Sequence, residues 1–249
     1  MISNDKKPKI LSQIKEIEDF VISHDDRAST IDALRDVLAE ESAELAKLSD
    51  SLTPILRTSL VINNTEAAMK SRYKRFVEKF PSISTLSALK RVMDSTKPWD
   101  FCKTYLKIDA NPAAADKNPK YCLLRELTDG FLEYQKVESL SSEIDAIRQW
   151  SKVVGLKAES AANFREFHKY LKKDDPIGKR RGVGPAVVQN IKLCLGENVG
   201  KTDRNVNDVM KKFLKVEDSF EEFARFIGEE PRYLDYILFK YGQAKKISD

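Results

Sequence analysis

The sequence predicts an all-α protein. Only nine of its 249 residues are glycine, and none of them occurs before Gly130. Tight β-hairpin turns need backbone positions with positive φ, which glycine usually supplies, so the first half of the chain is poorly suited to a hairpin-rich sheet. Apolar residues recur at helical spacing nearly throughout, and no segment shows the period-two alternation of a half-buried strand.

The apolar periodicity divides the chain into a succession of helices. In the first half, the residues that mark helices fall within 10–21, 31–48, 54–61, 68–80, 86–92 and 99–106. In the second half, we expect helices at about 120–137, 142–154, 160–172, 185–195, 203–214, 217–227 and 231–241. No fixed-period repeat is present, which favours a globular fold with two lobes over a helical solenoid.

Several helix boundaries have a local chemical reason. Ser29, followed by Asp32, is typical of a capped helix start, and Ser84 or Thr85 can cap another. Pro54 is expected to open a helix, because proline lacks the N–H that a first helical turn leaves unused. The segment 108–119, with the sequence IDANPAAADKNP, is expected to form a linker or a long surface loop.

Composition excludes several protein classes. With 41% hydrophobic and 33% charged residues, the chain can bury a core, and no window is apolar enough to span a bilayer. The three cysteines are far apart and odd in number, which argues against a disulfide framework and against a clustered metal site. His24 and His168 are expected at the surface. We therefore expect a protein of a reducing intracellular compartment, with no signal peptide, no metal and no cofactor.

Charge is distributed unevenly along the chain, although the net charge is only +4. Residues 161–215 contain thirteen Lys or Arg and six Asp or Glu, whereas residues 1–60 contain eight basic and twelve acidic residues. The basic segment overlaps five of the nine glycines, which fall between Gly178 and Gly200. This coincidence favours a phosphate-bearing partner. The alternative explanation of this basic segment is that its lysines lie on solvent-exposed helix faces and bind no partner.

Gly182-Val183-Gly184 predicts a sharp turn between two helices, the second of which starts near Pro185. The two glycines let the backbone turn while the Val183 side chain enters the core. This helix-hairpin-helix leaves main-chain N–H groups exposed at the start of the second helix, where the helix dipole favours an anion. Such a site binds the phosphates of a nucleic-acid backbone and does not contact the base edges.

Nineteen residues after Gly184, Asp203 lies in the segment Lys201-Thr202-Asp203-Arg204-Asn205-Val206. The turn and the aspartate together resemble the helix-hairpin-helix base-excision DNA glycosylase superfamily, whose signature is L-P-G-V-G, a helix, and V-D-x-H-V. The resemblance implies that Asp203 is the catalytic carboxylate. An aspartate at a helix start can also be a structural N-cap.

The resemblance extends over about 55–242. It implies that Asn63, in the helix pair 58–89, fills the gap left by an extruded base, although a turn or cap role for this residue stays open. The C-terminal helix ending in Tyr241-Gly242 is similar to the closing helix of the family. The implied DNA contacts come from nine residues, namely Lys179, Arg180, Arg181, Gly182, Val183, Gly184, Ala186, Lys201 and Arg204.

The resemblance also implies the division into domains. Residues 1–54 form N-terminal helices without a named counterpart, and residues 55–249 form the glycosylase-like domain. Its first lobe covers about 55–195, including the hairpin at 163–195. The second lobe covers about 196–249 and is completed by the N-terminal helices.

Departures from the family pattern narrow the expected chemistry. Arg181 replaces the usual proline, Val188 a common alanine and Asn205 the usual histidine. Bifunctional members place a lysine two residues after the second glycine, where this chain has Ala186. A methyl group cannot form a Schiff base with the sugar, so AP-lyase activity is not expected. The four-cysteine cluster of some members is absent from the sequence as well.

The expected function is therefore that of a monofunctional DNA glycosylase, acting as a monomer on double-stranded DNA in a nucleoid or nucleus. Asp203 would stabilise the developing oxocarbenium ion and activate water. An aromatic pocket would hold the flipped base, with Trp99, Phe101, Tyr105 and Trp150 as candidates. A non-catalytic helix-hairpin-helix DNA-binding protein and a helical protein-interaction module are the alternatives.

Overall fold

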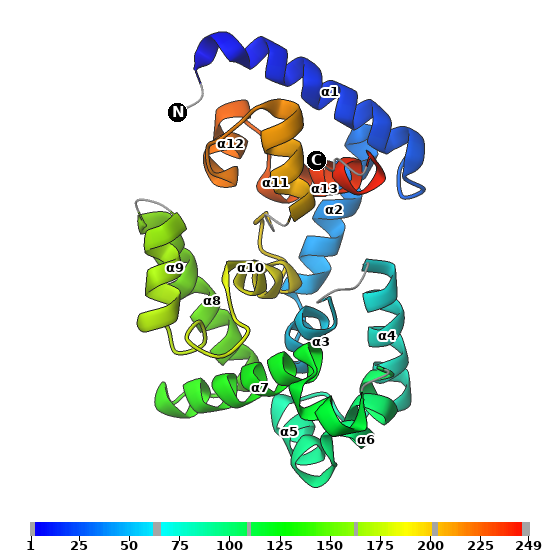
Figure 1. Ribbon diagram of the computed structural model, residues 1–249, viewed down its shortest axis with the longest axis vertical. Coiled ribbons are helices and arrows are strands. Elements are labelled where there is room, and N and C mark those ends of the chain that lie inside the picture. The colour runs from blue at the N-terminus through cyan, green and yellow to red at the C-terminus, as the bar shows by residue number, and fades with distance from the viewer. Residues whose placement is uncertain (1–2, 62–65, 109–110, 162–163, 201–203, 246–249) are drawn as a thin grey trace. The chain divides into compact units, whose positions relative to one another are not determined.

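Helices form all the regular secondary structure of the part of the chain that the computed structural model describes (Figure 1). The described residues are 3–61, 66–108, 111–161, 164–200 and 204–245. No strand occurs within these ranges, so the all-α prediction is confirmed. The chain divides into two units. We name Met1–Lys47 with Gly196–Asp249 the terminal unit, and Leu48–Leu195 the central unit.

The terminal unit combines the two ends of the chain, coloured blue and orange to red in Figure 1. Its helices are η1 (Asn4–Lys6), α1 (Lys7–His24), α2 (Ile31–Ala46), α11 (Arg204–Asp208), the π-helix η4 (Val209–Leu214), α12 (Phe220–Ile227) and α13 (Pro231–Lys245).

The core of the terminal unit forms because α1, α2, α12 and α13 each bury one apolar stripe. Polar contacts fix α13 against the N-terminal helices. The Tyr233 hydroxyl donates a hydrogen bond to Glu18 at 2.6 Å, and the Arg35 guanidinium lies 3.8 Å from the centre of the Tyr233 ring. Gly196, with φ of 80°, passes so close to α2 that a Cβ would overlap the carbonyl oxygen of Ser42.

The central unit contains the remaining helices. They are α3 (Leu52–Val61), α4 (Glu66–Lys79), α5 (Leu86–Ser95), α6 (Pro98–Phe101), the π-helix η2 (Cys102–Leu106), the 3-10 helix η3 (Pro112–Lys117), α7 (Pro119–Val137), α8 (Glu143–Ser160), α9 (Phe164–Lys173) and α10 (Pro185–Cys194).

Aromatic side chains occupy the centre of the central unit. Phe76, Phe101, Phe131 and Trp150 are almost completely buried, and Phe131 meets Trp150 edge to face at 5.2 Å. The aliphatic residues of α3, α7 and α10 pack around them in one continuous cluster. Burial of these rings fixes α8 beside α7 and so supports the segment between α9 and α10.

Some local predictions are confirmed and others are wrong. Thr85 caps α5, because its hydroxyl accepts the N–H of Ala88 at 3.1 Å. The cap of α2 is Thr30 rather than Ser29, and α3 begins two residues before Pro54. The expected helix at 99–106 changes from α to π geometry within its length, and the described part of the 108–119 loop includes η3.

Candidate nucleic-acid interface

A buried carboxylate organises the turn that joins α9 to α10. Asp175 is completely buried, and both of its oxygens accept the indole N–H of Trp150, at 3.0 and 3.1 Å. The backbone N–H groups of Ile177, at 3.0 Å, and of Gly178 also donate to this carboxylate. These donors compensate the burial of the carboxylate and hold the first half of the turn in one conformation.

Tyr170, near the end of α9, belongs to the same cluster. Its hydroxyl donates a hydrogen bond of 3.4 Å to Asp175. Burial, together with the neighbouring charge of Asp175, raises the pKa of Tyr170 to about 12. The phenol therefore stays neutral and keeps its proton for this bond throughout the neutral pH range.

Lys172 closes the second half of the turn. Its ammonium donates hydrogen bonds to the carbonyl oxygens of Gly178, at 3.1 Å, and of Val183. The Val183 side chain is 1% exposed and lies in the core of the central unit, as expected from the sequence. The turn is thus attached to the protein by a buried carboxylate, an ammonium and an apolar side chain.

Backbone donors are available where the turn enters α10. Gly182 has φ of 80°, a left-handed conformation that favours glycine, and Gly184 is the N-cap residue of α10. Pro185 has no N–H. Neither Gly184 nor Ala186 donates its N–H to any residue that the structure describes. These two groups can therefore bind an anion, and the methyl group of Ala186 is exposed beside them.

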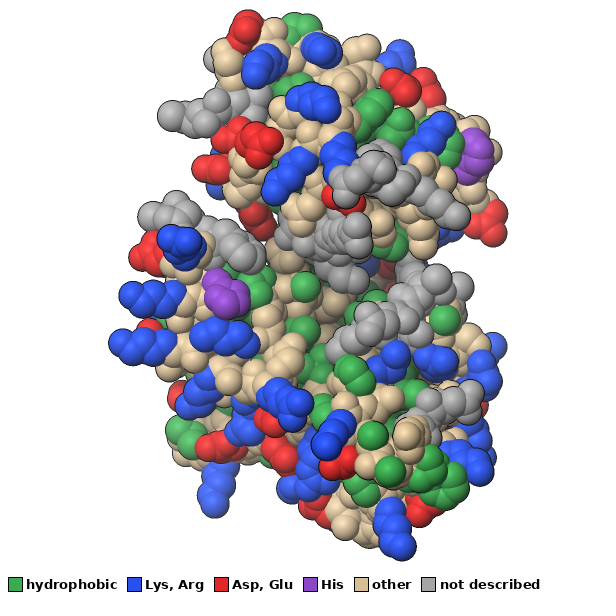
Figure 2. All heavy atoms as spheres, in the orientation of Figure 1, with side chains coloured by type: hydrophobic (Ala, Val, Ile, Leu, Met, Phe, Trp, Pro, Cys, Tyr) green, Lys and Arg blue, Asp and Glu red, His purple; other side chains and the backbone are tan. Residues whose placement is uncertain are grey.

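Lys and Arg side chains gather over α9 and the segment that follows it (Figure 2). Arg165, Lys169 and Lys173 are exposed and lie four residues apart, so they share one face of α9. In the turn, Lys179 and Arg181 are exposed and form no ion pair with a described residue. The face therefore presents uncompensated positive charge to the solvent.

Arg180 differs from its two neighbours. Its guanidinium pairs with Glu133 and, at 3.6 Å, with Glu126, both on α7, and the side chain is 21% exposed. The stem of Arg180 lies against Gly130, where a Cβ would come within 2.7 Å of its Nε atom. Among the three consecutive basic residues of the turn, Arg180 is the one that attaches the turn to α7.

Three residues expected at the site lie outside the described part of the chain. They are the expected catalytic residue Asp203, its neighbour Lys201 and the expected wedge residue Asn63. Arg204 is the first residue of α11, and α3 and α4 flank the segment that contains Asn63.

Gly242 supports the helix that follows Asp203. A Cβ at this position in α13 would come within 2.9 Å of both the carbonyl oxygen of Asn205 and the Cγ2 atom of Val209. The absence of a side chain at Gly242 thus allows α11 and η4 to pack directly on α13. The packing of α11 and η4 on α13 therefore depends on the glycine of the Tyr241-Gly242 pair.

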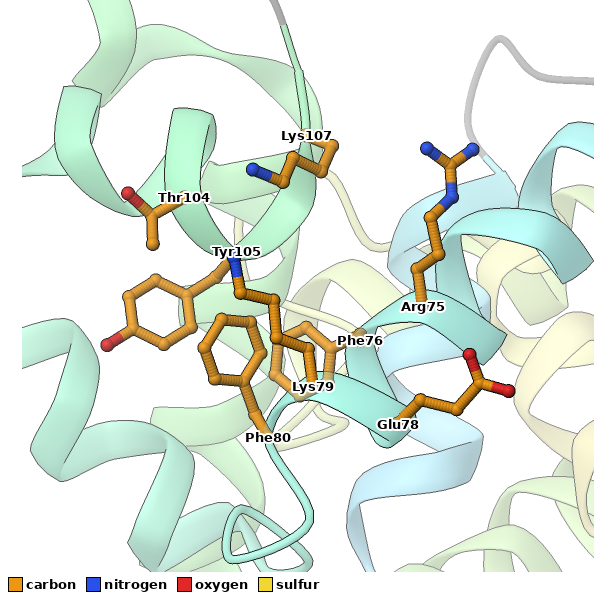
Figure 3. Close-up of a pocket in the computed structure, with 8 residues that line it drawn as sticks. All are labelled: Arg75, Phe76, Glu78, Lys79, Phe80, Thr104, Tyr105 and Lys107. Carbon is orange, nitrogen blue, oxygen red and sulfur yellow. The ribbon is translucent and has the colours of Figure 1, made fainter.

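The four aromatic candidates for a base pocket do not line one common depression, although Phe101 and Tyr105 stack on each other at 5.0 Å. Trp150 is 1% exposed and Phe101 0%, so both belong to the core and neither offers a surface to a base. Trp99 is partly exposed, with the Lys103 ammonium 4.9 Å from its ring. Tyr105 is partly exposed and lines a depression of about 290 Å³ beside the end of α4 (Figure 3).

The residues that shape the turn from within were missed by sequence reasoning. Asp175 precedes Pro176, and an aspartate before proline is typical of a turn, so this signal was present. The pairing of Asp175 with Trp150 depends on tertiary packing and has no signal in the sequence. Lys172 looks like one more basic residue of α9, although its ammonium binds backbone carbonyl groups.

The described ranges lack the features of a metal site and of a membrane span. These ranges contain no group of three or more His, Cys, Asp or Glu side chains placed to hold a metal ion. None of the helices described has both the length and the apolar character needed to cross a membrane.

The chain was also compared with known proteins. No protein-family model matches it, and neither a curated protein nor a solved structure is significantly similar to it.

Proposed function

We propose that this protein is a monofunctional DNA glycosylase, which hydrolyses the N-glycosidic bond of a damaged or mispaired base extruded from duplex DNA. One observation carries the proposal from the structural side. The free N–H groups of Gly184 and Ala186 lie in a turn that Asp175 holds in place and that also exposes Lys179 and Arg181. This arrangement suits a phosphodiester, whose charge is favoured by both the amides and the cations.

The catalytic part of the proposal rests on the sequence resemblance. Asp203, as a carboxylate, would stabilise the positive charge that develops on the sugar and accept a proton from the attacking water. Ala186 supplies no amine, so the sugar would be released as an abasic site without a covalent enzyme intermediate. The proposed role of Asp203 is supported by α13, because the close approach of Gly242 to the Asn205 backbone lets α11, which starts at Arg204, pack on this helix.

A panel of duplexes, each with one lesion or mispair, tests this function. After incubation with the protein, alkali cleaves the strand at any abasic site. We expect cleavage on at least one substrate, and borohydride should trap no covalent complex. Asp203→Asn should abolish turnover and leave DNA affinity within about twofold, because one carboxylate contributes little to phosphate binding. Asp208→Asn is the matched control on α11, since Asp208 pairs with Lys212 at 3.6 Å.

Two results would contradict the glycosylase. Duplex binding that weakens with salt, without turnover on any substrate, would make the protein a non-catalytic DNA-binding protein. A lack of DNA affinity even at low salt would exclude both functions and favour a protein partner for the basic face.

A further inference from the structure

A second candidate binding site lies in the central unit, away from the turn residues. The depression at the end of α4 is lined by three aromatic and three basic side chains (Figure 3). They are Phe76, Phe80, Tyr105, Arg75, Lys79 and Lys107. Its volume of about 290 Å³ is at the lower end of the range for small-ligand sites and suits one flat ring system.

The aromatic floor is continuous with the core. Tyr105 stacks on the buried Phe101 at 5.0 Å with an angle of 17°, and its ring centre lies 4.4 Å from that of Phe80. Phe76 is 2% exposed, whereas Phe80 and Tyr105 are only partly buried. Phe101 and Phe80 both contact the Tyr105 ring, and the Lys79 ammonium lies 5.6 Å from the centre of the Phe80 ring. The aromatic surface left for a base is therefore the partly exposed part of Tyr105 and Phe80.

The rim of the depression is positively charged. Lys79 and Lys107 form no ion pair with any residue that the structure describes, and the Arg75 guanidinium donates to the Ser71 hydroxyl at 3.0 Å. Glu78 is the one carboxylate of the lining, and it reaches Lys74 at 3.8 Å. An anion at this rim would therefore meet little repulsion.

The backbone at Lys107 is unusual for a lysine. The π-helix η2 ends at Leu106, and Lys107 follows with φ of 52° in the left-handed region. Glycine would adopt this conformation without steric cost, and π-helical segments are frequent at functional sites. A lysine at this position places an ammonium at the depression, where glycine would leave none.

We infer that this depression holds an unpaired nucleotide of a DNA strand, with its base against Tyr105 and Phe80 and its phosphates at Lys107, Lys79 and Arg75. Aromatic stacking beside a basic groove is the usual means of holding single-stranded nucleic acid. In Figure 3, the ends of Lys107 and Arg75 both lie above the ring cluster, so the phosphates of the strand would pass along this edge of the depression. Glu78, the one carboxylate of the lining, pairs with Lys74 at 3.8 Å, and we assign the site a holding role with no part in bond cleavage.

This inference rests on the proposed function for the nature of the partner, and its test uses fluorescence anisotropy of the full chain with labelled DNA. Three probes are compared, namely a blunt duplex, the same duplex with a short single-stranded extension, and that extension built from abasic nucleotides. We expect the extension to tighten binding about tenfold, and the abasic extension to lose most of this gain because it carries phosphates without bases.

Lys107→Gly is the decisive variant, because glycine suits φ of 52° and the fold does not depend on the ammonium. We expect it to reduce the gain from the extension severalfold. Lys215→Gly is the matched control, since Lys215 also follows a π-helix with φ of 57° and is exposed. Tyr105→Ala should remove most of the gain, and Tyr105→Phe should restore it because stacking needs only the ring.

Each remaining outcome overturns a defined part of the argument. If the blunt duplex binds but the extension adds nothing, or if Lys107→Gly and Lys215→Gly behave alike, the depression holds no strand nucleotide and the proposed function is untouched. If a free mononucleotide binds and the extension adds nothing, the site takes a small ligand instead. If no DNA binds at low salt, this inference and the proposed function fail together.

Discussion

The indole nitrogen of Trp150 lies 3.0 and 3.1 Å from the two carboxylate oxygens of Asp175, and both side chains are completely or almost completely buried. This contact connects α8 to the turn that exposes the amides of Gly184 and Ala186. A buried carboxylate is costly unless donors surround it, so its presence here identifies the turn as a rigid element. The turn proposed to bind phosphate therefore already has its binding conformation before DNA binds.

Asp175→Asn should lower the free energy of unfolding by about 2–3 kcal/mol, because the amide turns a donor toward the Trp150 N–H and weakens the bonds from the backbone. DNA affinity should fall in the same variant. Asp174→Asn is the matched control, since Asp174 is exposed, and it should change stability by less than about 0.5 kcal/mol. Urea unfolding measures the stability of both variants. Equal stability of the two variants would contradict the role of Asp175.

Alkaline titration should detect the Tyr170–Asp175 contact. Burial and the Asp175 charge raise the pKa of Tyr170 from 10.0 to about 12, so the folded protein holds this proton more tightly than the unfolded chain does. The resulting stability is present below pH 10 and is lost as the pH rises toward 12. Tyr170→Phe should therefore flatten this part of the stability curve. An unchanged slope between wild type and variant would show that the phenol is not buried against a charge.

The three consecutive basic residues should act differently on DNA binding. Lys179→Ala and Arg181→Ala should each reduce the slope of log affinity against log salt by about one, because each removes one phosphate contact. Arg180→Ala should leave this slope unchanged and lower the free energy of unfolding by about 1 kcal/mol, because its guanidinium pairs with acidic residues of α7. A fall in slope for all three variants would contradict the assignment of Arg180.

Gly182→Ala and Gly228→Ala form a matched pair. Both glycines are exposed, their φ values are 80° and 82°, and neither would bring a Cβ closer than 3.5 Å to another residue. Each change should cost about 1 kcal/mol of stability through left-handed strain. Only Gly182→Ala should also lower DNA affinity, by roughly fivefold, as expected for one weakened hydrogen bond. Similar DNA affinities of the two variants would exclude the turn as the binding element.

The helical fold was predictable because it depends on local patterns. Apolar spacing predicted most helices, and Thr85 was recognisable as a cap from its own chemistry. The π-helical geometry of 102–106 was not predictable, because α and π turns have nearly the same apolar spacing over five residues. Predictions of local conformation thus failed where two helical forms fit one pattern.

The proposed site was predictable only in part. Glycine chemistry identified the turn, and the positive φ of Gly182 agrees with the reason given for it. Whether an arginine is free or paired depends on residues distant in sequence, as Arg180 and Glu133 show. The same holds for Trp150, an expected pocket residue that instead supports Asp175 from within the core. Long-range packing decides the role of such side chains, and a single sequence does not contain it.

Gly242→Ala tests whether the packing of α11 on α13 matters for glycosylase turnover as well as for stability. The added Cβ would meet the Asn205 carbonyl oxygen and Val209 at 2.9 Å, so α11 must move away from α13. We expect a loss of about 1–3 kcal/mol from overpacking, together with reduced glycosylase turnover. Gly155→Ala is the control within α8, where the Cβ would displace only the flexible end of Lys192 and the gain in helix propensity offsets that cost. If Gly242→Ala unfolds at the same urea concentration as wild type and keeps full turnover, α13 does not determine the position of the segment that contains Asp203.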